Sequence, residues 1–349
     1  MLTADRFSMT ERGFDVTNKE WIRRVLGHEE GLDVPYNLSL SPPARRALER
    51  HYGTDDVEAF LDLPIRMTAP QSIKPLYAAP EAFGDRAVDE FGVVWSTSRI
   101  DRGSPVAPPL AEPSLADYTF PDPAAEYRFE PLGEWCRRNA EHFTVVWVGD
   151  LWERATFLCG MERLLLWTAL EPDFVRSLLR GIADYVLATM EILLGRFEFD
   201  AAALSDDYGT QQSLLMSPAA WREFVKPHLA EVFGLARSAG RAMMLHSCGN
   251  VRAIVPDLVE LGLDILHPIQ PEAMDVFELK RRFGAELAFF GGLGTQELLV
   301  GAAPREVRSE VRRLQREMGA GGGYLLEPGI TLQADVPLEN LLALIDEAS

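Results

Sequence analysis

In residues 242–272, AMMLHSCGNVRAIVPDLVELGLDILHPIQPE, two short apolar runs enclose a helical pattern. The first run is Ala242–His246, the helical pattern covers Val251–Leu261, and the second run is Asp264–His267. Short apolar runs bounded by turn residues are typical of buried strands, and strands that alternate with helices form βαβ units with a parallel sheet. The stretch therefore predicts an α/β fold.

The same alternation continues on both sides of this stretch. Further strands are predicted at Val34–Leu38, Thr144–Gly149, Ala201–Ser205, Leu287–Phe290 and Tyr324–Leu326. Further helices are predicted at Pro42–His51, Asp173–Phe197, Val276–Phe283, Pro304–Met318 and Pro337–Asp346. A helix that opens at Ser217-Pro218 should kink or divide at Pro227. Residues 104–131, rich in proline and acidic residues, predict an irregular excursion or lid.

These elements favour a (β/α)8 TIM barrel with an N-terminal helical extension, formed by residues 1–349 as a single domain. The extension is a helix at Asn18–Leu26, capped by Thr17 or Asn18. The alternative is a doubly wound open sheet. It is weakened because no Gly-x-Gly-x-x-Gly follows an early strand.

Composition excludes several classes of protein. A net charge of -19 argues against binding to nucleic acid and to anionic membranes. No apolar run is long enough for a transmembrane helix, and Met1–Val16 lacks the apolar core of a secretory signal. Three scattered cysteines do not form a disulfide framework, so we expect a cytoplasmic protein.

Polar and ionisable residues collect directly after the predicted strands. They are Asp150, Trp152, Glu153, Asp206, Asp207, Tyr208, His246, Cys248, Asn250, His267, Gln270, Glu272 and Glu327. Because the carboxyl ends of the strands of such a barrel meet at one face, these side chains are expected to share a pocket. Asp206, His246, Gln270 and Glu327 in particular are predicted to approach one cavity.

His246 and Cys248 are the most informative pair. Residues i and i+2 of an extended segment point the same way, so the imidazole and the thiol should face one cavity, as two zinc ligands do. A structural histidine beside a buried cysteine is the alternative. Of the neighbours Asp206 and Asp207, one at most should face the pocket, as a metal ligand or a substrate-orienting carboxylate. The alternative for either is a helix cap or a salt bridge.

Several segments resemble the uroporphyrinogen decarboxylase-like superfamily, and within it the cobalamin-dependent methyltransferase branch. The segments are DDYGTQ (206–211), HSCGNV (246–251), PIQPEAMD (268–275), FGGLGTQ (290–296), GGYLL (322–326) and DVPLEN (335–340). The resemblance implies a methyltransferase that uses zinc and a corrinoid (cobalamin) carried on a partner protein. In the expected pocket, substrate contacts are predicted at Trp152, Asp207, Tyr208, Gln211, Asn250, His267, Gln270 and Glu272. For Trp152 and Tyr208 the alternative is core packing.

At two places the sequence departs from the family pattern, and these departures bear on the reaction and on the metal ligands. The Arg-Gln-Ala-Gly-Arg-type segment of true uroporphyrinogen decarboxylases is absent around Tyr36–Leu40, which argues against porphyrinogen decarboxylation. The last strand-end loop, 326–330, has neither Cys nor His as a third metal ligand. Glu327 is the expected substitute, with Asp206 or Asp207 as alternatives.

The leading hypothesis is therefore a corrinoid-dependent methyltransferase, and more narrowly an O-demethylase that moves a methyl group from a methoxy compound to a corrinoid protein. Zinc would be held by His246, Cys248 and Glu327, and the catalytic residues would be His246, Asp206 and Glu327. Two other hypotheses stay open. One is a metal-independent decarboxylase or lyase of a small acid, with His246 as proton donor. The other is a catalytically lapsed barrel that binds a ligand or partner.

Overall fold

Strands alternate with helices along most of the chain, as the sequence predicts. The computed structural model describes residues 16–349. The strands of the main sheet are β1 (Ile65–Thr68), β5 (Phe143–Gly149), β6 (Ala201–Ser205), β7 (Ala242–His246), β8 (Ile265–Ile269), β9 (Ala288–Leu293) and β10 (Tyr324–Pro328). They follow one another in the order β1-β5-β6-β7-β8-β9-β10, and the pairs β5–β6, β6–β7, β7–β8 and β9–β10 are parallel.

The chain divides into two compact units. The first unit comprises residues 1–66, 139–144 and 268–349, and the second comprises residues 67–138 and 145–267. The single domain expected over residues 1–349 stays a prediction.

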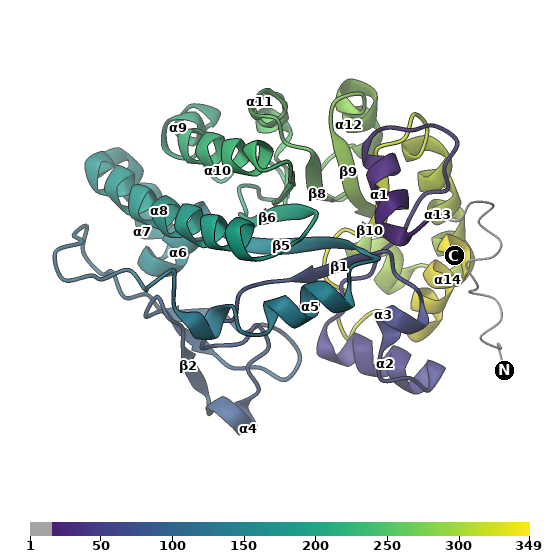
Figure 1. Ribbon diagram of the computed structural model, residues 1–349, viewed down its shortest axis with the longest axis horizontal. Coiled ribbons are helices and arrows are strands. Elements are labelled where there is room, and N and C mark those ends of the chain that lie inside the picture. Colours follow the sequence, from purple (N-terminus) through teal and green to yellow (C-terminus); the bar gives the residue numbers. More distant parts are fainter. Residues whose placement is uncertain (1–15) are drawn as a thin grey trace. The chain divides into compact units, whose positions relative to one another are not determined.

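The second unit holds most of β5 and all of β6 and β7, with their helices. These helices are α5 (Leu132–Arg138), α6 (Trp152–Cys159), α7 (Met161–Leu170), α8 (Pro172–Arg196), α9 (Pro218–Phe224), α10 (Lys226–Ser238) and α11 (Val255–Leu261), and a 3-10 turn at Arg252–Ile254 precedes α11. Helices α8 and α10 pack side by side, and α10 packs against β7 (Figure 1). Ser217 caps α9 through its side chain, and the helix divides before Pro227, as predicted.

A small antiparallel sheet in the second unit was not predicted from the sequence. It consists of β2 (Arg86–Val88), β3 (Val94–Ser96) and β4 (Pro105–Ala107), and helix α4 (Pro80–Phe83) precedes it. Each strand has only three residues, too few to show an alternating pattern. Strand β4 and the 3-10 turn Glu126–Arg128 are the only regular elements of the described excursion 104–131, which is otherwise irregular as expected.

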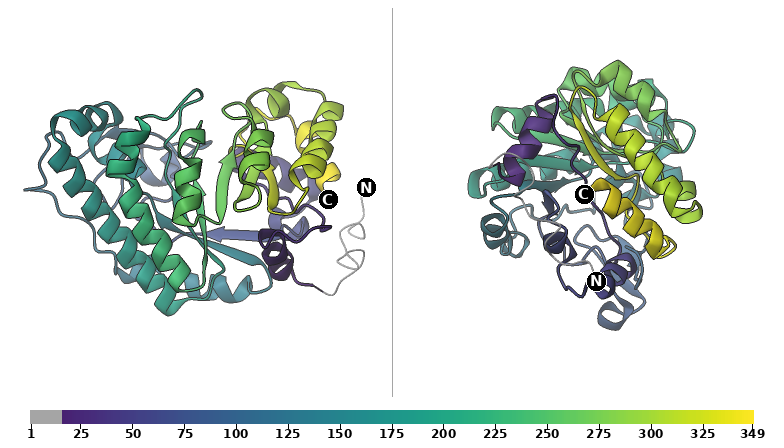
Figure 2. Two further views of the ribbon diagram at one scale, coloured as in Figure 1. Left: turned by 90° about the horizontal axis from the view of Figure 1, so that it is seen from above. Right: turned by 90° about the vertical axis from the view of Figure 1, so that its right-hand side faces the viewer.

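Within the described residues, the first unit holds β9, β10 and six α-helices. The helices are α1 (Asn18–Leu26), α2 (Pro42–Tyr52), α3 (Val57–Phe60), α12 (Val276–Phe283), α13 (Pro304–Met318) and the last helix, α14 (Leu338–Ala348). Thr17 caps α1 by accepting a hydrogen bond from the Glu20 N–H, as predicted. Helices α13 and α14 pack against each other and lie side by side in the right-hand view of Figure 2. The buried Tyr324 hydroxyl donates to the Gly291 carbonyl at 2.8 Å.

Of these helices, α3 is a single turn of four residues, and the others are longer. After β9, the chain forms one π-helical turn at Thr295–Leu299 before α13. The Asn340 side chain of α14 donates to the carbonyls of Leu299 and Ala302 at 2.9 Å each, which ties the end of this turn to the last helix.

Two expectations about the sheet need revision. The segment Val34–Leu38 is not a strand: it belongs to a stretch that pairs with the β10 region only through isolated bridges, Tyr36 to Leu326 and Leu40 to Leu332. Proline at position 35 removes a backbone donor, which works against a regular ladder there. A closed eight-stranded barrel is therefore confirmed only in part, since residues 16–349 contain a sheet of seven strands. Apart from Val16, the stretch Met1–Val16 lies outside the described residues.

The hydrogen bond between Tyr324 and Gly291 should contribute measurably to the stability of the first unit. Replacing Tyr324 with Phe should lower the free energy of unfolding by about 1 kcal/mol, because a buried carbonyl loses its donor. The same change at the partly exposed Tyr52 should cost less than about 0.5 kcal/mol. Urea denaturation of both variants measures the difference, and equal stabilities would contradict the assignment.

Candidate metal centre

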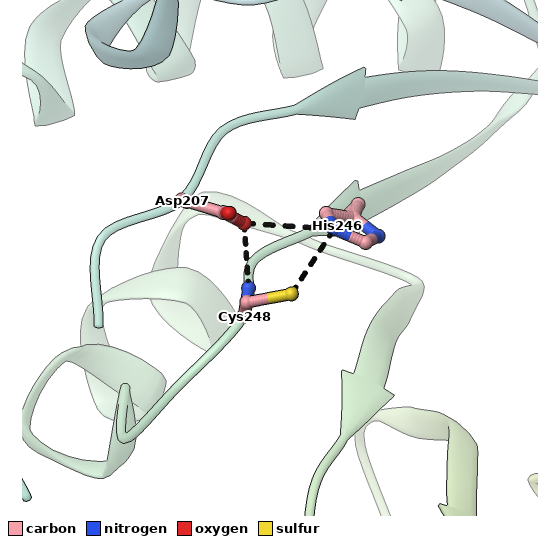
Figure 3. Close-up of side chains that lie close together, drawn as sticks. All are labelled: Asp207, His246 and Cys248. Carbon is pink, nitrogen blue, oxygen red and sulfur yellow. Dashed lines mark hydrogen bonds and ion pairs between the residues drawn. The ribbon is translucent and has the colours of Figure 1, made fainter. Parts of the chain in front are cut away.

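The carboxyl ends of β6 and β7 bring three possible metal ligands together. The two strands pair in register until Ser205 lies opposite His246. Asp207 lies two residues beyond Ser205, and Cys248 lies two residues beyond His246. The ligand atoms of Asp207, His246 and Cys248 all lie within 4.8 Å of one another. Figure 3 shows the three side chains close together at the ends of the two strands.

Direct contacts link these three side chains. The Cys248 thiol lies 3.5 Å from Nε2 of His246, as the spacing of the two residues predicts. An oxygen of Asp207 lies 3.5 Å from the same nitrogen and accepts a hydrogen bond from the Cys248 N–H at 2.8 Å. All three residues are half-buried. We call Asp207, His246 and Cys248 the ligand cluster.

Backbone contacts hold the two strand-end loops of the cluster together. The Gly209 N–H donates to the Cys248 carbonyl at 3.2 Å, and the Asn250 N–H donates to the Thr210 carbonyl at 2.7 Å. A Cβ atom on Gly249 would lie 2.4 Å from the Gly209 carbonyl carbon, and Gly249 has a φ of +81°. Glycine is therefore required at position 249 both for its backbone conformation and for the close approach of the loops.

His267 orients the imidazole of His246. The Nδ1 atoms of the two rings lie 3.0 Å apart, so one nitrogen must carry the proton and the other must accept it. With Nδ1 of His246 protonated, its Nε2 lone pair faces Cys248 and Asp207. A second partner on the far nitrogen is the usual arrangement for a histidine that binds a metal.

The electrostatics of the cluster couple Asp207 to His246. Burial opposes ionisation of both groups, but the contact with His246 lowers the pKa of Asp207 to about 2. Asp207 and Cys248 in turn raise the pKa of His246 to about 10 against the effect of burial. A metal ion that binds here must displace the proton of His246, as metal binding to histidine generally does.

Asp206 points away from the cluster into the core. Its carboxylate accepts hydrogen bonds from the N–H groups of Trp152 and Glu153, at 3.1 and 2.6 Å, and from the Tyr208 hydroxyl at 2.5 Å. Complete burial raises the pKa of Asp206 to about 8, against the effect of these donors. This geometry suits a residue that anchors the start of α6, and the catalytic role expected for Asp206 stays a prediction.

The other candidates of the second unit differ in their surroundings. Trp152 and Tyr208 are fully buried, and the Tyr208 ring packs against Trp221 with 5.8 Å between ring centres. Asn250 donates to the Gln212 carbonyl at 3.1 Å, which fixes the loop, and Gln211 is exposed. The surroundings of Trp152 and Tyr208 resemble core packing, and substrate contact at these four positions stays a prediction.

The remaining candidates belong to the first unit. Glu327 is buried and accepts hydrogen bonds from Asn37 at 3.2 Å and Ser39 at 2.9 Å. Gln270 donates to the Gly329 carbonyl at 2.9 Å. Glu272 accepts from the N–H groups at the start of the π-helical turn, at 2.7 and 2.9 Å. Their expected roles in metal or substrate binding stay predictions, as does the single cavity expected for Asp206, His246, Gln270 and Glu327.

Two residues near the cluster were missed or undervalued in the sequence. Arg102, in the loop between β3 and β4, forms an ion pair with Glu153 at 3.1 Å. The second oxygen of Glu153 lies 3.4 Å from the Ser205 hydroxyl, at the end of β6. Burial and the neighbouring charge of Asp207 raise the pKa of Glu153 to about 7. Glu153 follows a predicted strand, but no sequence signal marks Arg102, because the strands beside it are too short to predict.

Comparison with known proteins places the chain in a family. Residues 98–349 match the sequence profile of uroporphyrinogen decarboxylase (URO-D). The chain belongs to the URO-D family. A solved structure described as a methyltransferase from Methanosarcina mazei shares its fold, with a TM-score of 0.71 and 19% identity over 96% of this chain and 98% of that chain.

The curated relatives that this chain matches include methyltransferases and decarboxylases. A methylated-thiol–coenzyme M methyltransferase of Methanosarcina mazei is 23% identical over 256 residues, which are 71% of this chain and 66% of that protein. A methylcobamide:CoM methyltransferase of Methanosarcina barkeri is 24% identical over 55% of this chain and 53% of that protein. A uroporphyrinogen decarboxylase of Thermus thermophilus is 29% identical over 38% of this chain and 37% of its own length. The chain thus spans about half to two thirds of the methyltransferases that it matches.

The donor set of the ligand cluster fits zinc. Zinc in proteins takes imidazole nitrogen, thiolate sulfur and carboxylate oxygen, and catalytic sites keep a fourth position open. The cluster offers one donor of each kind. As for membranes, none of the helices formed by residues 16–349 is both long and apolar enough to cross one.

Close packing at Gly249 should be essential for the cluster. Replacing Gly249 with Ala should lower the free energy of unfolding by at least about 2 kcal/mol and weaken zinc binding, because both strain and a steric clash result. Gly240 is the matched control, since its φ is +66° but an added Cβ would meet nothing within 4 Å. Gly240→Ala should cost only about 1 kcal/mol of backbone strain and leave zinc binding unchanged. Urea denaturation and zinc titration measure both effects, and equal behaviour of the two variants would contradict the proposed role of the loop contact.

Proposed function

We propose that this protein is a zinc- and corrinoid-dependent methyltransferase, which moves a methyl group between a small molecule and a corrinoid protein. The observation that carries the proposal is the ligand cluster, with its nitrogen, sulfur and oxygen donors at the ends of β6 and β7. The methyltransferases among its relatives support this assignment. The reaction we favour is the O-demethylation of a methoxy compound. We further propose that the protein forms a complete (β/α)8 barrel and acts in the cytoplasm.

His246 and Cys248 would hold the zinc ion, with a carboxylate as third protein ligand. We assign Asp207 to this third position, because its oxygen already lies 3.5 Å from Nε2 of His246. Glu327, the substitute expected from the sequence, accepts hydrogen bonds from Asn37 and Ser39 within the first unit. It remains the competing assignment. When bound, zinc supplies Lewis acidity toward the oxygen or sulfur atom of a substrate.

The protein's own residues would prepare the site for this chemistry. His267 keeps the Nε2 atom of His246 available by pairing with Nδ1. Trp147, whose ring centre lies 6.1 Å from that of His246, would limit the access of water to one side. Glu153 would exchange a proton with a thiol or alcohol group near neutral pH, the range in which an acid–base catalyst is most effective.

The corrinoid would be carried by a partner protein, and the methyl donor or acceptor would be a small molecule.

A lyase or decarboxylase that needs no metal is the second candidate, favoured by the likeness to uroporphyrinogen decarboxylases. In that reaction His246 would donate a proton to the product. A lapsed barrel that only binds a ligand would show neither activity. Metal analysis separates these alternatives first.

Cysteine variants test the metal site. Cys248→Ser should abolish stoichiometric zinc while the protein stays folded, because the core does not depend on the cluster. Cys136→Ser is the control and should retain zinc, since Cys136 lies on α5, outside the ligand cluster. Metal analysis by mass spectrometry, with circular dichroism as a check on folding, measures both outcomes. Wild-type protein that holds no zinc when purified without chelators would contradict the site.

Carboxylate variants of the same series identify the third ligand. Asp207→Asn should weaken zinc binding by more than about tenfold. Loss of a residue that only supports a metal ligand already costs about tenfold in metal affinity, and loss of a ligand should cost more. Glu327→Gln should change zinc affinity no more than Glu317→Gln does at an exposed helix position of the first unit. If Glu327→Gln is the variant that loses zinc, the third ligand is Glu327 and the assignment of Asp207 is wrong.

Methyl transfer itself can be followed through the absorbance of the cobalt centre. Zinc-loaded protein with a reduced corrinoid protein and a methoxy compound should convert the spectrum to that of methylcobalt, and Asp207→Asn should slow this conversion by about a hundredfold or more. Arg316→Gln, a change on the exposed face of α13, is the control and should leave the rate unchanged. No spectral change across a panel of methoxy compounds and thiols would favour the lyase or the lapsed barrel. A porphyrinogen decarboxylation assay should be negative.

A further inference from the structure

The loop between β3 and β4 brings a cation close to the ligand cluster, and this cation is not used by the chemistry proposed above. Arg102 lies in this loop, and its side chain is 49% exposed although it pairs with the buried Glu153. Asp207 and Asp150 are among the carboxylates that raise the pKa of Arg102, which places its guanidinium in their electrostatic field. All of these residues belong to the second unit.

The loop holds Arg102 in a defined position. Lys74 donates to the Arg102 carbonyl at 3.2 Å, and the Gly103 N–H donates to the Asp101 side chain at 2.8 Å. Gly103 has a φ of +74°, and a Cβ atom there would lie 1.9 Å from the Ser96 carbonyl oxygen. The tight turn therefore requires glycine and fixes the direction in which the residue before it leaves the backbone.

The guanidinium of Arg102 has donors to spare. It carries five N–H groups, and its one hydrogen bond to the described residues runs from Nη2 to Glu153 at 3.1 Å. Arg154, the other arginine beside Asp150, instead directs its donors to Asp150 and Asp89 and is only 17% exposed. Of these two arginines, Arg102 is the one with donors available to a ligand.

We propose that Arg102 is a specificity-determining residue that selects substrates bearing an oxyanion, such as a carboxylate, by binding that group through the donors that Glu153 does not use. This inference rests on the proposed function for the identity of the reacting group. Glu153, Asp150 and Asp207 would repel an anion from this part of a protein with a net charge of -19. A guanidinium is the side chain best suited to hold a carboxylate against such repulsion, because its planar fork matches the two oxygens.

The alternative role for Arg102 is that of a structural counter-ion to Glu153. The two roles differ in a measurable way. A counter-ion affects the binding of charged and neutral substrates alike, through the stability of the loop. A substrate-binding arginine affects only those substrates that carry the anion.

Equilibrium binding to zinc-loaded protein without a corrinoid protein separates the two roles, because no methyl transfer is then needed. The probes are two pairs of compounds of matched size: 4-methoxybenzoate with 4-methoxybenzyl alcohol, and 3-mercaptopropionate with 3-mercapto-1-propanol. Wild-type protein should bind the acid of a pair about tenfold or more tightly than the alcohol, the effect of a charge-assisted hydrogen bond. Arg102→Gln should remove this preference and leave the affinity for the alcohol unchanged.

Three further variants sharpen the test. Arg99→Gln is the matched control, since Arg99 lies in the same loop but pairs with Glu81 at the surface. It should keep the preference. Arg102→Lys should retain part of the preference, because the charge remains but the planar fork is lost. Glu153→Gln should increase the affinity for the acid, because a neutral amide holds the Arg102 guanidinium less strongly than a carboxylate does and a repelling charge is removed.

The outcomes distinguish this inference from the proposed function. Three outcomes would overturn the inference, even if methyl transfer is observed. The acid preference could survive in Arg102→Gln, the wild type could bind acid and alcohol equally, or it could bind neither acid. A preference that depends on Arg102, in a protein that transfers no methyl group to or from cobalt, would support the anion site and count against the methyltransferase alone.

Discussion

The close approach of two backbone loops, at Gly209 and Gly249, is the constraint on which the candidate site depends. Neither position has room for a Cβ atom, because each glycine meets the backbone of the other loop. The N–H of Gly209 and the N–H of Asn250 close the contact with hydrogen bonds across it. Since Asp207 precedes one glycine by two residues and Cys248 immediately precedes the other, this contact sets the distance between the carboxylate and the thiol.

The neighbouring residues Asp206 and Asp207 divide two tasks between them. Asp207 joins the ligand cluster, whereas Asp206 turns inward and accepts the N–H groups of Trp152 and Glu153. Through those bonds Asp206 places the first turn of α6, and with it the Glu153 carboxylate that pairs with Arg102. The end of β6 thus organises both the ligand cluster and the charged residues beside it. A buried carboxylate held by several donors is well suited to such a positioning role.

Much of the strand and helix order could be predicted from the sequence, because most strands of the main sheet are short apolar runs that end in polar residues. Ala242–His246 and Val276–Phe283 have the bounds that the sequence predicts. The strands β2, β3 and β4 could not be predicted, since three residues carry no usable periodicity. The spacing of His246 and Cys248 predicted that their side chains meet. It could not show that Asp207 joins them, because that contact depends on two loops that are distant in sequence and on the glycines between them.

The carboxylate of the ligand cluster bears on the kind of reaction that the site favours. Oxygen is a harder ligand than thiolate and donates less electron density, so a zinc ion with one thiolate, one imidazole and one carboxylate is a stronger Lewis acid than one with two thiolates. The Cys248 N–H already donates to Asp207 at 2.8 Å, which draws further electron density from the same oxygen. Both effects favour polarisation of an ether oxygen over activation of a thiol. In the proposed function, the ligand cluster would therefore favour the removal of a methyl group from oxygen. A carboxylate on the substrate, held at Arg102, would orient the ether without adding a ligand to the metal.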